Sequence, residues 1–381
     1  MLYYLIRYLV SGQHYAYENA LFRGACAALF AFILVVIVGP WVIRRLVAAK
    51  LGDHPEFDHK SLNELMADKR NVPTMGGILI VSTVLLATLL LADVANFYVI
   101  MGMVCAAWLG LLGAVDDWFK LTAAKRSGSR DGLKFHEKLL FQIGLAVLLG
   151  YFVYSFGQTN YAVVGPVSPG TQVEAFRILS VPFYKAGFML GTYAFMIMAV
   201  LVITGTSNAV NLTDGMDGLA SGCVSMCSLV FLILTYIVGD KEVAAKLLIP
   251  HVPLSGELAI VAGAILGACL GFLWYNCCPA RVFMGDTGSL PLGGLIGYIA
   301  VVTRQELILF IVGGVFVIEA VSVMIQVGAY KLSGGRRRVW KCTPIHHHFH
   351  LTGWTEGQVV ARFWLLAAVF AIFALTTVKL R

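Results

Sequence analysis

The sequence predicts an all-α protein that crosses a membrane many times, and three observations predict this fold class. Hydrophobic residues make up 59% of the chain and charged residues only 13%, with a mean hydropathy of +0.81. Apolar runs of about 20 residues, the length that crosses a bilayer as a helix, recur along the chain. Lys and Arg gather in alternate loops between them. Soluble globular proteins lie outside this range, so we expect one integral-membrane domain over residues 1–381.

The apolar runs mark about ten transmembrane helices. The first run ends at Arg44-Arg45 without a small-residue cleavage signature, so we interpret it as an anchor that is retained. The eighth run is short, and the ninth contains Glu319 and Gln326, so these two fit the pattern less well. The predicted segments are 20–43, 76–95, 97–115, 138–157, 187–206, 219–239, 257–275, 289–303, 307–330 and 357–378.

Positive charge predicts which side of the membrane each loop occupies. Most Lys and Arg residues lie in the loops 44–75, 116–137, 205–217, 276–288 and 331–356. By the positive-inside rule these loops are cytoplasmic, and both chain termini lie outside. The formal charge of +7 is therefore concentrated on one face. Such a face attracts anionic lipid head groups and also suits a phosphorylated substrate.

The eight cysteines do not form a recognisable disulfide framework. Most of them lie inside apolar segments or on the predicted cytoplasmic side, where disulfides are rare. Cys277 and Cys278 are adjacent and so are poorly placed to chelate one metal ion together. We interpret this pair as packing residues.

The stretch from Asn211 to Gly218 places two carboxylates, an amide and two glycines between long apolar runs. Ionisable residues at the end of a membrane helix cost free energy unless they face water, a metal or a partner, which favours a functional interpretation. Asn211, Asp214 and Asp217 recur every three residues and could share one face of a helical turn. The structural alternative is that Asp214 or Thr213 caps the apolar helix that begins near Leu219.

Three further motifs stand at predicted cytoplasmic helix ends. Asp116 and Asp117 end the third apolar run, where the helix dipole disfavours carboxylates, so we prefer function over a solvated helix end beside Lys120. Asp286 lies between glycines in a short loop and suits Mg²⁺, although a turn residue is an equal alternative. Lys69 and Thr74 precede the second run and could contact a phosphate or a base edge.

Four of the nine histidines lie in the run from Pro344 to His350. A tract of this kind can indicate a transition-metal site, or acid–base chemistry with phosphate contact. An expression tag is excluded because the run is internal, with another apolar helix after it. Zinc would need a matching set of Cys or His ligands, and Cys342 alone does not supply one.

Taken in order, these motifs resemble the polyprenyl-phosphate N-acetylhexosamine-1-phosphate transferase superfamily, and within it the phospho-N-acetylmuramoyl-pentapeptide transferases. The resemblance covers nearly the whole chain, and its most specific part is the Pro-Ile-His-His-His run. Asn71-Val72 depart from the Gly-Thr that the family usually has there. The loop between Gln326 and His346 is slightly longer than in close relatives.

The resemblance implies ten transmembrane helices and a Mg²⁺-dependent enzyme of peptidoglycan synthesis in the bacterial inner membrane, with periplasmic termini. At its cytoplasmic face undecaprenyl phosphate would attack UDP-MurNAc-pentapeptide, giving lipid I and UMP in one step or two. Asp116 and Asp117 match the essential aspartate pair, Asp286 the magnesium ligand and His347 the essential histidine. The other expected substrate contacts are Lys69, Thr74, Lys120, Asn211, Asp214, Asp217, Asn276, Phe283, His346 and His348.

Two other functions remain open at this point. A transporter also keeps carboxylates and histidines in the membrane, but here the polar motifs gather at helix ends and not at the midplane. A related enzyme could use a UDP-N-acetylhexosamine without a peptide, against which the His346–His348 run argues. The expected partners are the two substrates and the bilayer; a homodimer is kept open, and no nucleic acid is expected.

Overall fold

The computed structural model describes residues 1–9, 16–49, 69, 72–127, 132–156, 176, 178–183 and 188–379. Within these ranges the regular secondary structure is helical, apart from one antiparallel pair of two-residue strands, β1 (Ile178–Leu179) and β2 (Phe188–Met189). Eight of the described helices are long and apolar enough to cross a membrane. They are α2 (Ala20–Ala48), α5 (Phe97–Ser127), α6 (Phe135–Phe156), α7 (Thr192–Thr213), α8 (Leu219–Gly239), α10 (Leu258–Asn276), α13 (Gly314–Leu332) and α15 (Glu356–Lys379).

The second and the eighth of the predicted spans are not among these helices. The second is α4 (Gly77–Leu91), whose 15 residues fall short of the usual length, since at about 1.5 Å per residue it covers less than a hydrocarbon core of about 30 Å. The eighth is α11 (Asp286–Thr303), in which every residue is buried. The predicted ninth span divides at Gly313 into α12 (Glu306–Val312) and α13.

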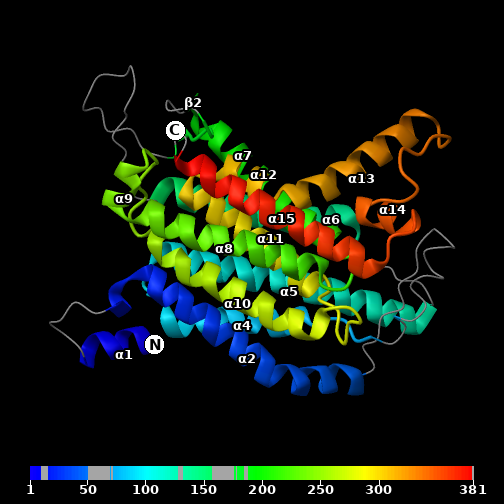
Figure 1. Cartoon of the computed structure of the whole chain (residues 1–381), viewed down its shortest axis with the longest axis horizontal. Helices are drawn as coiled ribbons and strands as arrows, with labels where there is room; N and C mark the ends of the chain where they lie inside the picture. The colour runs from blue at the N-terminus through cyan, green and yellow to red at the C-terminus, as the bar shows by residue number, and fades with distance from the viewer. Residues whose placement is uncertain are drawn as a thin grey trace.

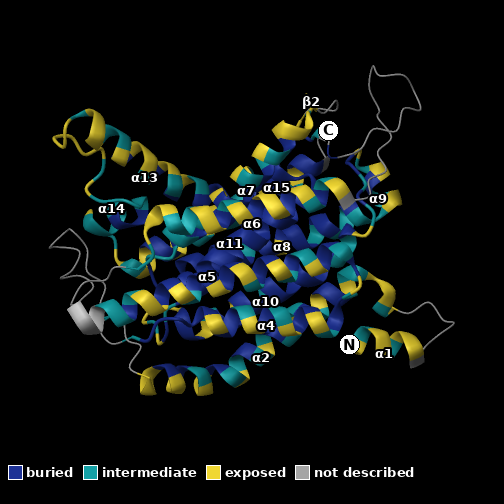
Figure 2. Ribbon diagram, turned by 180° about the vertical axis from the view of Figure 1, so that it is seen from behind, coloured by how far each residue is buried: buried dark blue, intermediate teal, exposed yellow. Residues whose placement is uncertain are grey.

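Helix α11 forms the centre of the bundle, and Figure 2 shows it among the buried segments. It packs against α5 and α7, while α10 packs against α2 and α8. Gly113 allows α5 to meet the first turn of α11, because a Cβ at this position would lie 2.2 Å from the carbonyl oxygen of Asp286. This close approach places Asp116 and Asp117, about one helical turn further along α5, beside the N-terminus of α11.

The described residues of the five loops predicted to be cytoplasmic lie toward one end of the bundle. Hydrogen bonds and ion pairs join the chain around Lys69, Asp116, Asp217, Asp286 and Glu356 there. Both termini lie toward the opposite end in Figure 1, where the Met1 ammonium donates to Leu89 O at 2.7 Å. The remaining elements are α1 (Leu2–Leu9), η1 (Ala16–Glu18), α9 (Lys241–Lys246), η4 (Ser255–Glu257) and α14 (Ile345–Leu351).

Helix α13 departs from the bundle toward its C-terminal end, with α14 following it (Figure 1). Its outer face is apolar and exposed, and Leu332 is 92% exposed at its last position. A surface of this kind is stable in contact with lipid.

Candidate active site

Asp117 holds the N-terminus of α11 in place. Its Oδ1 accepts a hydrogen bond from Asp286 N at 3.2 Å, and its Oδ2 accepts two from Thr287, from N at 2.9 Å and from Oγ1 at 2.6 Å. A helix N-terminus favours a negative charge because its first N–H groups lack partners within the helix. Asp117 thus satisfies those donors and orients Asp286, the first residue of α11.

Asp116 and Asp286 share two lysines. Lys138 Nζ lies 2.6 Å from Asp116 Oδ2 and 2.7 Å from Asp286 Oδ2, and Lys120 Nζ lies 2.7 Å and 3.1 Å from the same two atoms. The other oxygen of Asp116 accepts a hydrogen bond from Leu133 N at 2.7 Å. We call Asp116, Asp117, Asp286, Lys120 and Lys138 the carboxylate–lysine cluster. Its carboxylates are nearly inaccessible to solvent, since Asp286, the most exposed, is only 7% exposed.

Asn211 joins this cluster from α7. Its Nδ2 donates to Asp286 Oδ1 at 2.8 Å and to Ser289 Oγ at 2.9 Å. The expectation that Asn211, Asp214 and Asp217 share one helical face is wrong, because α7 ends at Thr213 and the following turn directs the three side chains differently. The capping alternative is also wrong, because Gly218 is the N-cap of α8.

Asp217 belongs to a second group, around Lys69. Lys69 Nζ forms ion pairs with Asp217 Oδ1 and with Glu356 Oε1, and it lies 5.9 Å from the centre of the Phe283 ring. Asp217 Oδ2 accepts a hydrogen bond from Ala280 N at 2.9 Å, and Glu356 Oε1 accepts one from Asp217 N at 2.8 Å. The positive charge of Lys69 is therefore neutralised by Asp217 and Glu356, which do not belong to the carboxylate–lysine cluster.

Asp214 lies within electrostatic range of both groups. Burial raises the pKa of Asp214 to about 7, and the negative charges of Asp286 and Asp117 add to this shift. A carboxyl group with a raised pKa is protonated over part of the physiological range, so Asp214 can donate a hydrogen bond there.

We expect Asp214→Asn to raise the thermal unfolding midpoint in the presence of chelator, and more at about pH 8 than at about pH 5. The native carboxyl binds a proton that the unfolded chain has lost, so stability falls as pH rises from about 4 toward 7. Scanning fluorimetry of both proteins at the two pH values measures the difference. An equal shift at both values would contradict this placement of Asp214.

The two histidines His346 and His347 pack over Gly215. A Cβ on Gly215 would lie 2.4 Å from His346 Nε2 and 3.4 Å from His347 Nε2, so only glycine fits there. His346 Nδ1 lies 3.0 Å from Glu319 Oε2, and both side chains are fully buried. Burial lowers the pKa of His347 to about 2, and His346, His350 and Lys69 act in the same direction. His347 is therefore neutral at physiological pH.

Three of the other predicted residues contact neighbouring parts of the protein in this structure. Asn276 Oδ1 accepts a hydrogen bond from Gly218 N at 3.1 Å, and its Nδ2 donates to Val282 O at 2.8 Å. Thr74 is buried near Gly285. His348 Nδ1 accepts a hydrogen bond from Lys341 N at 3.3 Å, away from the carboxylates.

Sequence reasoning missed several members of the site. Lys138 stood out only as one of several loop cations, and Glu319 only as a polar residue that weakened a predicted span. Glu356 opens the last apolar helix and gave no signal, because it meets Lys69 from 287 positions away. The interpretation of Cys277 and Cys278 as packing residues is wrong, since both are exposed.

The carboxylate–lysine cluster fits a hard divalent cation. One oxygen from each of Asp116, Asp117 and Asp286 lies within 4.8 Å of the other two. Mg²⁺ prefers oxygen ligands, and it commonly binds one or two carboxylates together with substrate phosphates. Because Asp117 is committed to α11, Asp116 and Asp286 are the carboxylates free to exchange lysine contacts for a metal ion.

Fold and site together define a multi-pass membrane protein with a buried cluster of carboxylates and lysines at one end. Comparison with known proteins agrees with this description. Residues 98–304 match the model of glycosyl transferase family 4. The chain is 43% identical to the phospho-N-acetylmuramoyl-pentapeptide-transferase of Desulfotalea psychrophila, over 94% of this chain and 93% of that protein.

Proteins of the same name from two other bacteria agree over still more of the chain. That of Citrifermentans bemidjiense is 41% identical over 100% of both chains, and that of Thermodesulfovibrio yellowstonii is 42% identical over 98% and 97%. The chain therefore belongs to the phospho-N-acetylmuramoyl-pentapeptide-transferases of glycosyl transferase family 4.

Proposed function

We propose that this protein transfers phospho-N-acetylmuramoyl-pentapeptide from its UDP carrier to undecaprenyl phosphate, giving lipid I and UMP. The observation that carries the proposal is the agreement between family membership and a buried cluster of three carboxylates and two lysines. Phosphoryl transfer depends mostly on positioning and on neutralising charge around the transferred group, and this cluster offers both.

Within the cluster we assign each side chain a role. Asp286 and Asp116 would hold Mg²⁺, which when bound polarises the phosphate oxygens and neutralises their charge. Lys120 and Lys138 pair with these carboxylates and can turn to the diphosphate as it enters. Asp117 keeps α11 and Asp286 in position, so Asp116 is the member of the pair that faces the lipid phosphate, as base or nucleophile.

The residues around Gly215 and Lys69 would receive the donor. Lys69 and Phe283 offer a cation and an aromatic face, which suit a phosphate and a base. His347 is neutral, so it would contact the substrate through hydrogen bonds and not through charge. Glu319 orients His346, and the close contact with Gly215 holds both histidines against the 214–218 turn.

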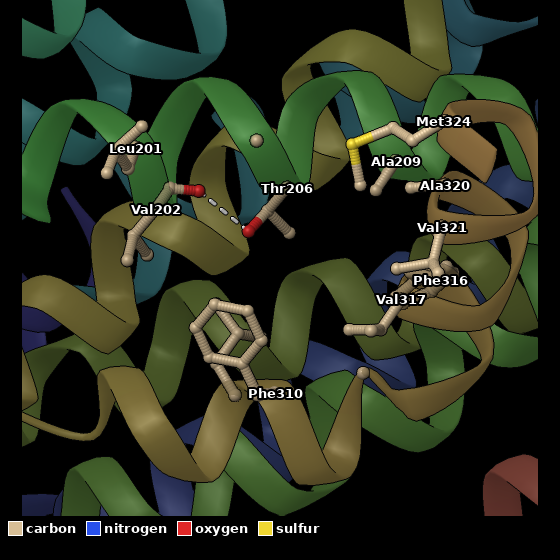
Figure 3. Close-up of a pocket in the computed structure, with 13 residues that line it drawn as sticks. Leu201, Val202, Thr206, Ala209, Phe310, Phe316, Val317, Ala320, Val321 and Met324 are labelled. Atoms are coloured by element: carbon tan, nitrogen blue, oxygen red, sulfur yellow. Dashed lines mark hydrogen bonds between the residues drawn. The ribbon is translucent and has the colours of Figure 1, made fainter. Parts of the chain in front are cut away.

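An apolar cavity of about 210 Å³ between α7, α12 and α13 suits part of the prenyl chain. Figure 3 shows that Leu201, Phe310 and Met324 contribute to its wall, where the hydroxyl of Thr206 donates a hydrogen bond to Val202 O, at 2.7 Å. The cavity therefore exposes little polarity to a hydrocarbon. It reaches Ala209, two residues before Asn211, so a chain bound here would bring its phosphate toward the cluster.

We further propose that α4 and α11 complete a set of ten spans in the bacterial inner membrane, with the site at the cytoplasmic face and both termini in the periplasm. Helix α11 is buried throughout, and α4 packs against α2, α5 and α10, which are long enough to cross. The Lys and Arg asymmetry of the loops supports the orientation.

Cysteine labelling tests this topology. We expect Ser333→Cys to be labelled from the cytoplasm and Lys241→Cys from the periplasm, each in a background without Cys277, Cys278 and Cys342. Lys241 is exposed and Ser333 is half-buried between exposed neighbours, and the two positions lie at opposite ends of the bundle. Labelling of both from the same side would overturn the arrangement.

The reaction itself is tested with purified protein, Mg²⁺ and undecaprenyl phosphate. Release of UMP is measured with UDP-MurNAc-pentapeptide and, separately, with UDP-GlcNAc as donor. We expect UMP and a lipid-linked product from the first donor only. Release from UDP-GlcNAc alone would assign the chain to a different sugar phosphate.

A further inference from the structure

A second cluster of ligating side chains lies at the same end of the bundle and consists of Asp217, Cys278 and Glu356. One oxygen or sulfur atom from each lies within 4.8 Å of the other two. Asp217 stands in the turn before α8, Cys278 in the loop after α10, and Glu356 at the start of α15. Three segments that are distant in sequence therefore converge on one point.

The two carboxylates of this cluster already bind a cation, the ammonium group of Lys69. Their positions are fixed by backbone donors, because Asp217 Oδ2 accepts from Ala280 N and Glu356 Oε1 accepts from Asp217 N. Two carboxylates facing one ammonium leave a net negative charge. The cluster can therefore exchange a monovalent cation for a divalent one at an electrostatic gain.

Cys278 adds a ligand that an ammonium ion cannot use. Thiolate sulfur is a preferred ligand of Zn²⁺ and of other soft divalent cations. The thiol is exposed, so a cation in solution can reach it. Its neighbour Cys277 is exposed as well, but the Sγ of Cys277 lies 3.9 Å from Trp274 O and is not part of the cluster.

The helix that precedes Glu356, α14, also carries a nitrogen donor, His350. His350 Nδ1 is buried and has no hydrogen-bond partner among the described residues. Burial lowers the pKa of His350, whereas the charge of Glu356 acts in the opposite direction. The two carboxylates and the thiol of the cluster are ligands of the kind that zinc accepts.

We propose that Asp217, Cys278 and Glu356 form a binding site for a thiophilic divalent cation such as Zn²⁺ or Cd²⁺, which displaces Lys69 and thereby inhibits the enzyme. Binding forms one metal–sulfur and two metal–oxygen bonds, the thiol proton passes to solvent, and the ammonium group leaves both carboxylates. Zinc bonds of about 2.3 Å to sulfur and about 2.0 Å to oxygen require the ligands to draw closer, and the exposed Cys278 can move.

Loss of Lys69 from this position would remove the cation beside Phe283, where we place the donor. The apparent KM for the UDP-linked donor should therefore rise as the metal binds, at saturating Mg²⁺. This inhibition rests on the proposed function, whereas binding of the metal does not. The two are measured separately for that reason.

Binding is measured with Cd²⁺ through the ultraviolet absorption of the cadmium–thiolate bond, and inhibition with Zn²⁺ through UMP release. Wild type, Cys278→Ser and the matched control Cys277→Ser are compared as full-length protein in the same detergent, each checked for folding by its thermal unfolding midpoint. We expect wild type and Cys277→Ser to bind one equivalent and to be inhibited. Cys278→Ser should bind at least about tenfold more weakly and lose the inhibition in proportion.

Equal affinity of wild type and Cys278→Ser for Cd²⁺ would contradict the proposed metal site. Inhibition that disappears on adding Mg²⁺, with no difference between the variants, would place the metal in the carboxylate–lysine cluster and equally overturn it. If no variant releases UMP but Cd²⁺ binding still depends on Cys278, the metal site stands and the proposed function fails.

Discussion

Asp286→Asn should lower turnover at least about a thousandfold, since a metal-linked charge on a transferring phosphate contributes several kcal/mol to the transition state. An amide at this position loses the charge that a hard cation prefers and also loses its ion pairs with Lys120 and Lys138. It keeps the size of the side chain, so α11 should still begin at the same residue. The measurement is kcat of the purified variant at saturating Mg²⁺ and both substrates.

Asp240→Asn is a matched control for this experiment. Asp240 caps α9, with its carboxylate accepting hydrogen bonds from Glu242 N and Val243 N, at the opposite end of the bundle. The same loss of charge there should leave turnover within about twofold, since Asn caps a helix about as well as Asp and the position lies away from the site. Turnover near the wild-type value in Asp286→Asn would contradict the proposal that Asp286 holds the metal ion of the reaction.

Asp116→Asn and Asp117→Asn should both reduce turnover strongly, by about 100-fold or more, but for different reasons. Asp116 faces the two shared lysines, so its loss removes charge where the phosphates meet. Asp117 accepts three hydrogen bonds from the first turn of α11, so an amide there turns two acceptors into one acceptor and one donor. A mismatched buried hydrogen bond of this kind costs roughly 1–3 kcal/mol.

The two variants are separated by stability and by substrate affinity. We expect Asp117→Asn to lower the thermal unfolding midpoint more than Asp116→Asn does, and Asp116→Asn to alter KM for the lipid phosphate more. Identical effects on both quantities would contradict the division of roles. If both variants kept near wild-type turnover, the pair would serve only to hold α11 and the two lysines in place.

The fold class followed from the sequence because hydropathy depends on composition and segment length alone. The lengths of the individual helices did not, because the short helix α4 and the fully buried helix α11 owe their place to packing. Helix α11 contains Asp286, Pro291 and several glycines, and is stable because other helices surround it on all sides. The break at Gly313 has the same origin, since a run of apolar residues does not reveal where a helix bends away from its neighbours.

For the site, the sequence identified residues that differ chemically from their apolar surroundings. It could not predict which of these residues contact each other. Asp116, Asp117 and Asp286 stood out as carboxylates near lipid, and the structure brings them together. Lys138 and Glu356 looked ordinary because a lysine or glutamate at a helix end is common on any cytoplasmic loop. Their importance comes from long-range contacts, and the spacing of residues along one chain does not contain those contacts.

The central claim of this account is that Asp286 and Asp116 hold the divalent cation of the reaction. Electron paramagnetic resonance of the full-length protein measures the binding of Mn²⁺ and tests this claim without relying on activity. We expect wild type and Glu356→Gln to bind one Mn²⁺ tightly, and Asp286→Asn to lose that ion while remaining folded. Retention of the ion by Asp286→Asn, together with its loss in Glu356→Gln, would place the metal at the other cluster and contradict the account.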